Sequence, residues 1–196
     1  MNHFEIFGLE RKLGIDVAAL QRQFYELSRR YHPDFHAGAA PAEQARALES
    51  SAQLNAAYRT LRDPIARIDY LVRLEEGRET KEGTADKPKA PPELLEEMFE
   101  IQEASAEAKL GGLDEATRQT LHGQSGRLAN RQREEEARLI GPLSAAWDVA
   151  ASASQRSEVL AAFKQGLATR AYLRTVIDDL TQALGEGDAI VAHHRD

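Results

Sequence analysis

Apolar residues recur at helical spacing on both sides of a His-Pro-Asp tripeptide, and this arrangement constrains the fold most. The first stripe advances in steps of three and four, as one face of an α-helix does, and comprises Val17, Leu20, Phe24, Leu27 and Tyr31. Asp16 stands at the N-cap position, and Pro33 should end the helix because proline has no N–H to continue the ladder. A second stripe follows Pro41 and comprises Ala47, Ser51, Leu54, Tyr58 and Leu61. Two such helices joined by a loop of roughly ten residues are expected to pack antiparallel as a hairpin.

Shorter segments flank this hairpin and extend it to a four-helix unit. The stretch "NHFEIFGL" predicts one helical turn that covers the end of the hairpin with Phe4, Phe7 and Leu9. The stretch "DPIARIDYLVRL" predicts a helix that begins near Pro64 and has an apolar face of Ile65, Ile68, Leu71 and Val72. Residues 76–90 lack apolar periodicity and are rich in Gly, Thr, Lys, Glu and Pro, so they predict a linker. The first domain is therefore expected at residues 1–75.

Residues 91–185 predict a second domain, a three-helix bundle. Its first helix is expected to end at Gly111-Gly112, and its second, over 113–139, to be interrupted at "HGQSG". The stretch "GPLSAAWDVAASASQ" is expected to be a turn region with Trp147 as an anchor. The buried side of the last helix is expected to contain Leu160, Phe163, Leu167, Ala171, Val176 and Leu180. Residues 186–196 predict a flexible tail. Since no β-type pattern competes, the predicted fold class is all-α.

Composition and charge exclude several classes of function. The chain of 196 residues has no cysteine, which removes disulfides, thiolate catalysis and thiolate metal ligation. Neither a signal peptide nor a membrane-spanning run of apolar residues is evident, so a cytoplasmic protein is expected. The net charge is −7, and residues 1–74 carry 10 Lys and Arg against 9 Asp and Glu, which leaves the remainder clearly acidic. An acidic second half disfavours binding to nucleic-acid phosphates as the main function.

The His-Pro-Asp tripeptide has three interpretations from the residues alone. In an extended loop His32, Asp34 and His36 could project to one side and bind a metal ion or transfer protons. They could instead be solvated loop residues after a helix stop. The third interpretation rests on three arginines of the preceding helix that lie away from its apolar stripe, namely Arg22, Arg29 and Arg30. An arginine face that ends in a fixed His-Pro-Asp turn would suit docking to an acidic partner.

A family resemblance selects among these interpretations. The run "YHPDF" between two amphipathic helices, preceded by "FYELSRR" and followed by "LNAAYRTLRDP", resembles the J domain of co-chaperones. With "HFEIFGLERKLGID", "ARIDYL" and the helical remainder ending in "RAYLRTVIDDL", the chain is similar to HscB-type J proteins of iron–sulfur cluster assembly. The resemblance implies that His32, Pro33 and Asp34 stimulate a DnaK-type (HscA-like) ATPase, to which the three arginines dock. It also implies that the chain is no enzyme and carries no metal or other cofactor. Phe35 departs from the family, in which a basic residue often follows the tripeptide.

The resemblance also implies that the second domain binds an IscU-type scaffold protein. The positions that match this surface are Leu94, Leu95, Met98 and Phe99 on its first helix and Tyr172 on its last. On a three-helix bundle, apolar residues at this spacing belong to the core more often than to an interface, and Leu95 and Phe99 lie at the edge of the stripe. Two other functions stay open: a J protein with a different client or only a dimerisation bundle, and a helix-turn-helix protein that binds nucleic acid through its arginine helix.

Overall fold

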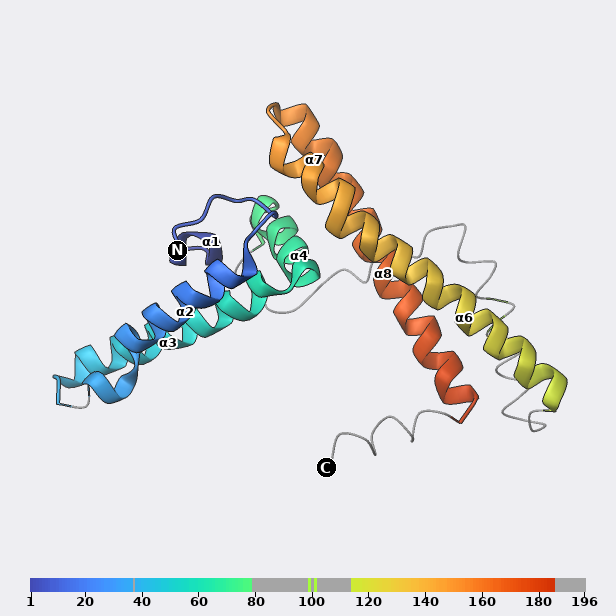
Figure 1. Ribbon diagram of the computed structural model, residues 1–196, viewed down its shortest axis with the longest axis horizontal. Helices are drawn as coiled ribbons and strands as arrows, with labels where there is room; N and C mark the ends of the chain where they lie inside the picture. Colours follow the sequence, from blue (N-terminus) through green and yellow to red (C-terminus); the bar gives the residue numbers. More distant parts are fainter. Residues whose placement is uncertain (37, 79–98, 100, 102–113, 186–196) are drawn as a thin grey trace. The chain divides into compact units, whose positions relative to one another are not determined.

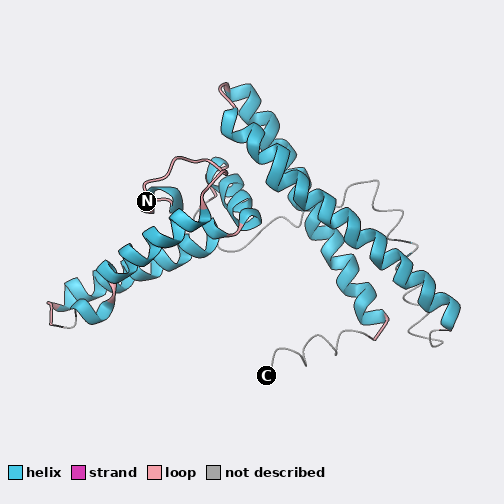
Figure 2. Ribbon diagram, in the orientation of Figure 1, coloured by secondary structure: helices cyan, strands magenta, loops and turns pink. Residues whose placement is uncertain are grey.

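The computed structural model describes residues 1–36, 38–78, 99, 101 and 114–185, and among these residues it contains helices and loops but no strand (Figure 1, Figure 2). The predicted all-α fold class is confirmed. Most of the predicted first bundle helix, including Leu94, Leu95 and Met98, lies outside the described residues. In the described part of the chain, no helix has the length and apolar character that crossing a membrane requires.

The chain divides into two compact units, which are described separately. The first unit joins Met1–Thr80 to Ile140–Phe163, and the second joins Lys81–Leu139 to Lys164–Asp196. The first unit thus combines the predicted first domain with a segment of the predicted bundle. The sequence-based boundaries at residues 75 and 90 stay predictions.

Four helices build the N-terminal part of the first unit, as the apolar periodicity predicted. They are α1 (His3–Ile6), α2 (Val17–Tyr31), α3 (Pro41–Arg62) and α4 (Pro64–Glu75). Helices α2 and α3 lie side by side as a hairpin (Figure 1). The apolar stripes meet in a core whose largest fully buried side chains are Phe4, Phe7, Leu20, Leu54, Leu61, Ile68 and Leu71. Phe24 of α2 stacks on Tyr58 of α3 with ring centroids 4.1 Å apart.

Local chemistry accounts for the ends of these helices. The Asp16 carboxylate accepts hydrogen bonds from the N–H groups of Ala18 and Ala19, so it caps α2 as predicted. Asp63 accepts from the N–H of Ala66 and caps α4. Helix α4 ends at Glu75, and Gly77, with a positive φ of 66°, then turns the chain so that the N–H of Arg78 donates to the carbonyl of Arg73 at 2.9 Å. These caps satisfy backbone groups that the helices themselves leave unpaired.

The C-terminal half contains α6 (Glu115–Arg138), a π-helical turn (Leu139–Leu143), α7 (Ser144–Val149) and α8 (Ala153–Ala183). The predicted interruption at "HGQSG" is wrong, because α6 runs through Gly123 and Gly126 without a break. Leu121 and Leu128 lie seven residues apart on one face of α6 and are both buried. Their packing offsets the roughly 1 kcal/mol that each interior glycine costs a helix.

Two further sequence-based expectations are corrected. The stretch 141–155 is largely helical rather than a turn region, and only residues 150–152 connect α7 to α8. Pro142 has no N–H to donate, and the chain passes it in the wider π-helical turn. On α8 the predicted core residue Ala171 is exposed while Leu173 is fully buried. The two positions differ by roughly 200° around the helix, so they face opposite sides.

Candidate functional site

The three predicted docking arginines lie on the exposed side of α2. Arg22, Arg29 and Arg30 are all exposed, whereas Leu20 on the opposite side of the helix is buried. Arg22 and Arg29 are seven residues apart and therefore share one face. The guanidinium of Arg30 lies 5.8 Å from the centroid of the Tyr31 ring. The helix thus presents a cationic surface, which we call the arginine face (Arg22, Arg29 and Arg30).

The His-Pro-Asp tripeptide forms a tight turn where α2 ends. His32 is the C-cap of α2, with φ −65° and ψ 129°, and a 3-10 turn follows at Pro33–His36. The extended conformation of His32 is the one that a following proline favours. The N–H of Asp34 donates to Nδ1 of His32 at 3.3 Å, and Oδ2 of Asp34 lies 3.6 Å from the same nitrogen. The two side chains are close to each other and both are exposed, so a partner can reach the imidazole and the carboxylate together.

Phe35 completes this turn on its outer side. Its N–H donates to the carbonyl of His32 at 3.1 Å, and its ring meets the His32 ring edge-on with centroids 6.2 Å apart. The Phe35 side chain is nevertheless 73% exposed. A large apolar side chain therefore stands beside the two polar groups of the turn.

A metal site at the tripeptide would require several ligand side chains to converge on one point. Among the described residues, no three His, Cys, Asp or Glu side chains gather as ligands of a metal ion.

The predicted scaffold-binding residues fall into three groups. Leu94, Leu95 and Met98 lie outside the described residues. Phe99 is 71% exposed, while its neighbour Ile101 is buried in the core cluster of the second unit. Exposure at Phe99 is what a contact residue requires.

Tyr172 on α8 lies between a core and a surface position. It is partly buried and packs against the core cluster of the second unit. Its hydroxyl oxygen is buried and has no hydrogen-bond partner in the described part of the chain. Burial raises the pKa of this phenol above its ordinary value. The phenol is therefore held neutral in the folded state.

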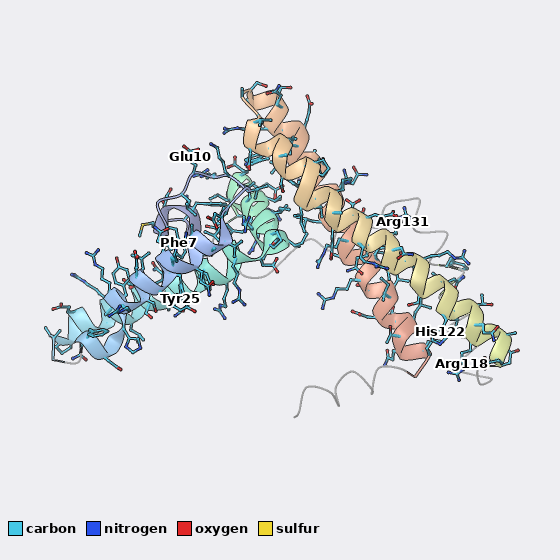
Figure 3. All side chains as sticks on the ribbon, viewed as in Figure 1. Phe7, Glu10, Tyr25, Arg118, His122 and Arg131 are labelled. Carbon is cyan, nitrogen blue, oxygen red and sulfur yellow. The ribbon has the colours of Figure 1, made fainter. Side chains whose placement is uncertain are left out.

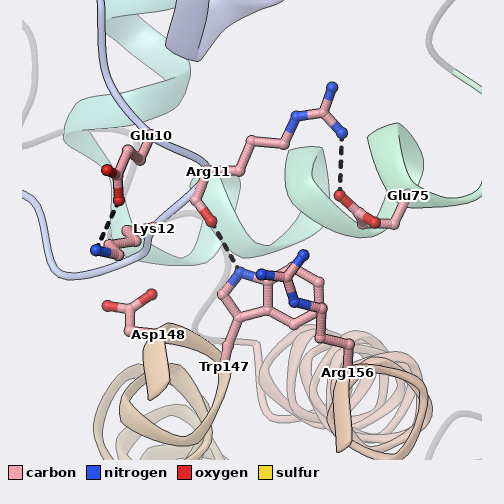
Figure 4. Close-up of a pocket in the computed structure, with 7 residues that line it drawn as sticks. All are labelled: Glu10, Arg11, Lys12, Glu75, Trp147, Asp148 and Arg156. Atoms are coloured by element: carbon pink, nitrogen blue, oxygen red, sulfur yellow. Dashed lines mark hydrogen bonds and ion pairs between the residues drawn. The ribbon is translucent and has the colours of Figure 1, made fainter. Parts of the chain in front are cut away.

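A contact that sequence reasoning missed holds the loop between α1 and α2 in the first unit. The carboxylate of Asp148 accepts hydrogen bonds from the N–H groups of Leu13 and Gly14, both at 2.7 Å. The indole N–H of its neighbour Trp147 donates to the carbonyl of Arg11 at 2.9 Å (Figure 4). We call Trp147 and Asp148 the 147–148 clasp. The sequence had signalled only that Trp147 would be an anchor, and it is buried with 4% exposure.

Arg67 of α4 fixes the same loop from the other side. Its side chain is only 4% exposed. Its Nε donates to the carbonyl of Leu61 at 2.7 Å, and its Nη1 donates to the carbonyl of Leu13. Burial lowers the pKa of Arg67, while the charges of Asp63 and Asp148 act in the opposite direction. The periodicity of α4 gave no sign that this arginine would be internal.

Beside the clasp lies an open pocket of about 400 Å³, which Figure 4 shows. Its lining residues are Glu10, Arg11, Lys12, Glu75, Trp147, Asp148 and Arg156. Arg11 pairs with Glu75 at 3.2 Å and Lys12 pairs with Glu10 at 2.6 Å. The three cationic and three anionic side chains balance, so the pocket has no net charge that would select a charged ligand.

Comparison with known proteins agrees with this geometry. Residues 2–70 match the family model of the DnaJ domain. Chaperone HscB from Vibrio cholerae is 24% identical, with a TM-score of 0.59 over 93% of this chain and 96% of that chain. The human co-chaperone protein HscB is 22% identical, with a TM-score of 0.62 over 93% of this chain and 81% of that chain. At these identities the likeness to the two structures establishes the fold.

Proposed function

We propose that this chain, whose residues 2–70 match the DnaJ domain and which has the HscB fold, is a co-chaperone of a DnaK-type (HscA-like) ATPase. One observation carries the proposal: the exposed side chains of His32 and Asp34 stand at the end of an exposed arginine face, on one helical hairpin. The two helices of the hairpin pack on each other through a shared core and a stacked aromatic pair.

The proposed mechanism involves no chemistry by this chain itself. The arginine face attracts an acidic surface of the chaperone, and His32 and Asp34 contact groups that change position during ATP hydrolysis. Tighter binding to the conformation that hydrolyses ATP shifts the chaperone toward that conformation. The chain is accordingly proposed to be no enzyme and to need no cofactor.

We further propose that the second unit delivers an IscU-type scaffold protein to the chaperone during iron–sulfur cluster assembly, in the cytoplasm. The HscB fold and the exposure of Phe99 support this proposal. The scaffold would contact a surface that includes Leu94, Leu95, Met98, Phe99 and Tyr172.

ATPase stimulation tests the first proposal. Wild-type protein should raise the ATPase rate of the purified DnaK-type partner, and His32→Gln or Asp34→Asn should lower the stimulation by about tenfold or more. Both side chains are exposed, so the variants should fold normally. Asp178→Asn is the matched control, since that carboxylate is 71% exposed and lies in the second unit. Stimulation by the two turn variants at the control's level would refute the assignment.

Scaffold binding tests the second proposal. A folded Leu95→Ala/Tyr172→Ala variant should lose affinity for the purified scaffold and should keep ATPase stimulation in the absence of scaffold. Equal affinity of this variant and the wild type for the scaffold would exclude the proposed surface.

A further inference from the structure

Three aromatic side chains are largely exposed in the described part of the chain: Tyr25 (58%), Phe35 (73%) and Phe99 (71%). Phe99 belongs to the proposed scaffold surface. Tyr25 and Phe35 accompany the arginine face and the His-Pro-Asp turn. A single exposed apolar residue is ordinary. Two exposed aromatic residues, one among exposed arginines on α2 and one in the turn that follows α2, match the composition of binding hot spots, in which aromatic residues and arginine predominate.

Tyr25 lies among the arginines of α2. It follows Arg22 by three residues and precedes Arg29 by four, which places it within roughly 60° of both around the helix. The Nε2 of Gln21 donates to the Tyr25 hydroxyl at 3.4 Å, and the Tyr25 ring lies 5.7 Å from the ring of Phe24. These contacts hold the exposed Tyr25 ring against neighbouring side chains of α2, and Figure 3 labels Tyr25 at the α2–α3 hairpin.

Phe35 is held in a comparable way at the end of the arginine face. The hydrogen bond from its N–H to His32 sets the backbone, and the edge-on contact with the imidazole sets the ring. An aromatic side chain with few rotatable bonds loses little conformational entropy when it binds, and prior orientation reduces that loss further. Both aromatic residues thus have the properties of contact residues.

We propose that Tyr25 and Phe35 are aromatic anchors that enter apolar depressions on the DnaK-type partner, while Arg22 and Arg29 pair with acidic groups around those depressions. This inference rests on the proposed function and adds the chemistry of the partner surface: apolar pockets with an acidic rim. The rim is proposed to be acidic because the arginine face requires groups of opposite charge on the partner.

The proposed arginine contacts and aromatic contacts should differ in how strongly salt weakens them. Salt screens the arginine contacts, since the screening length falls from about 10 Å at 0.1 M to about 3 Å at 1 M salt. Burial of aromatic surface is not weakened in this way. The affinity of the aromatic anchors should therefore persist at high salt.

The test measures the affinity of the full chain for the purified, ATP-loaded DnaK-type partner at about 0.1 M and about 1 M salt. Tyr25→Ala and Phe35→Ala should each weaken binding by about tenfold at both salt concentrations. Arg22→Ala should weaken it mainly at the lower one. Tyr25→Phe should bind as wild type. The matched control is Val149→Ala, which truncates a side chain that is 79% exposed on α7 and should change nothing.

Phe35→Lys replaces an apolar contact with the partner by a charged contact that salt screens. Its binding should fall more steeply with salt than that of the wild type. The inference is overturned if the Tyr25→Ala/Phe35→Ala double variant binds as tightly as wild type at both salt concentrations. Absence of binding and stimulation by the wild type would instead refute the proposed co-chaperone function itself, so the two failures are distinguishable.

Discussion

At the scale of single residues, two buried polar side chains differ in whether their polar atoms have hydrogen-bond partners. The buried guanidinium of Arg67 has two backbone carbonyl acceptors, one on α3 and one in the loop after α1. The buried hydroxyl of Tyr172 has no hydrogen-bond partner among the described residues. Unpartnered buried polar groups cost free energy, whereas partnered ones specify a geometry. The two residues should therefore respond to substitution in opposite directions.

Arg67→Lys should destabilise the protein. A lysine has a single ammonium group and cannot reproduce the two separate donors that serve Leu61 and Leu13. We expect the free energy of unfolding to fall by about 2 kcal/mol, measured by chemical denaturation. Arg73→Lys on the same helix is the control, because Arg73 is half exposed and makes a surface ion pair with Asp69 at 3.0 Å. An equal response of both variants would contradict the internal role of Arg67.

Tyr172→Phe should leave the fold intact and raise the free energy of unfolding by about 1 kcal/mol, because it removes an unpartnered buried hydroxyl. The pKa of Tyr172 is raised in the folded state above 10.0, its ordinary value. Stability from the neutral phenol is therefore complete below that pH and declines as the pH rises above it. Denaturation curves at alkaline pH should show this decline in the wild type and less of it in the variant. Tyr25→Phe, on an exposed ring, provides the comparison.

At the scale of elements, an interior glycine of α6 and one of α8 differ in the space available for a side chain. Gly123 of α6 has open space where a Cβ would be. A Cβ on Gly166 of α8 would lie 2.5 Å from Glu135 Oε1 and 2.8 Å from Leu139 Cδ2. Since Leu139 is fully buried, its side chain has little room to move. Gly166 therefore permits the close approach of α6 and α8 in the second unit, which the ion pair between Arg170 and Glu136 at 2.6 Å accompanies.

A matched pair of alanine substitutions tests this difference. Gly123→Ala should stabilise the protein by up to about 1 kcal/mol, because alanine is the better helix former. Gly166→Ala should destabilise it by about 1–3 kcal/mol, because overpacking outweighs the same propensity gain. Thermal and chemical denaturation measure both. Stabilisation by Gly166→Ala equal to that by Gly123→Ala would show that the helices do not need the close approach.

At the scale of the whole molecule, the first unit joins residues that are far apart in the chain. The 147–148 clasp reaches the loop before α2 across about 135 intervening residues. Truncation at Glu75 would therefore remove Trp147 and Asp148 along with the second unit, and a loss of function would have two causes. Point variants separate these causes better than truncation does.

Asp148→Asn should loosen the loop between α1 and α2. An asparagine side chain has one carbonyl oxygen and cannot accept from both Leu13 and Gly14 as the carboxylate does. The amide protons of Leu13 and Gly14 should exchange with solvent faster, and the free energy of unfolding should fall by about 1–2 kcal/mol. Asp178→Asn is again the control. Unchanged exchange at Leu13 and Gly14 would rule out the clasp in solution.

The sequence by itself determined the local elements of the first domain and the turn at His32–Asp34. Helical periodicity, Asp16, Pro41 and Pro64 act within a few residues, so they predicted α2, α3 and α4 without knowledge of the packing. Tertiary structure decided the continuity of α6, the burial of Leu173 in place of Ala171, the internal position of Arg67 and the 147–148 clasp. Each of these depends on a surface supplied by a distant segment, and packing against such a surface outweighs the local preferences that a sequence pattern expresses.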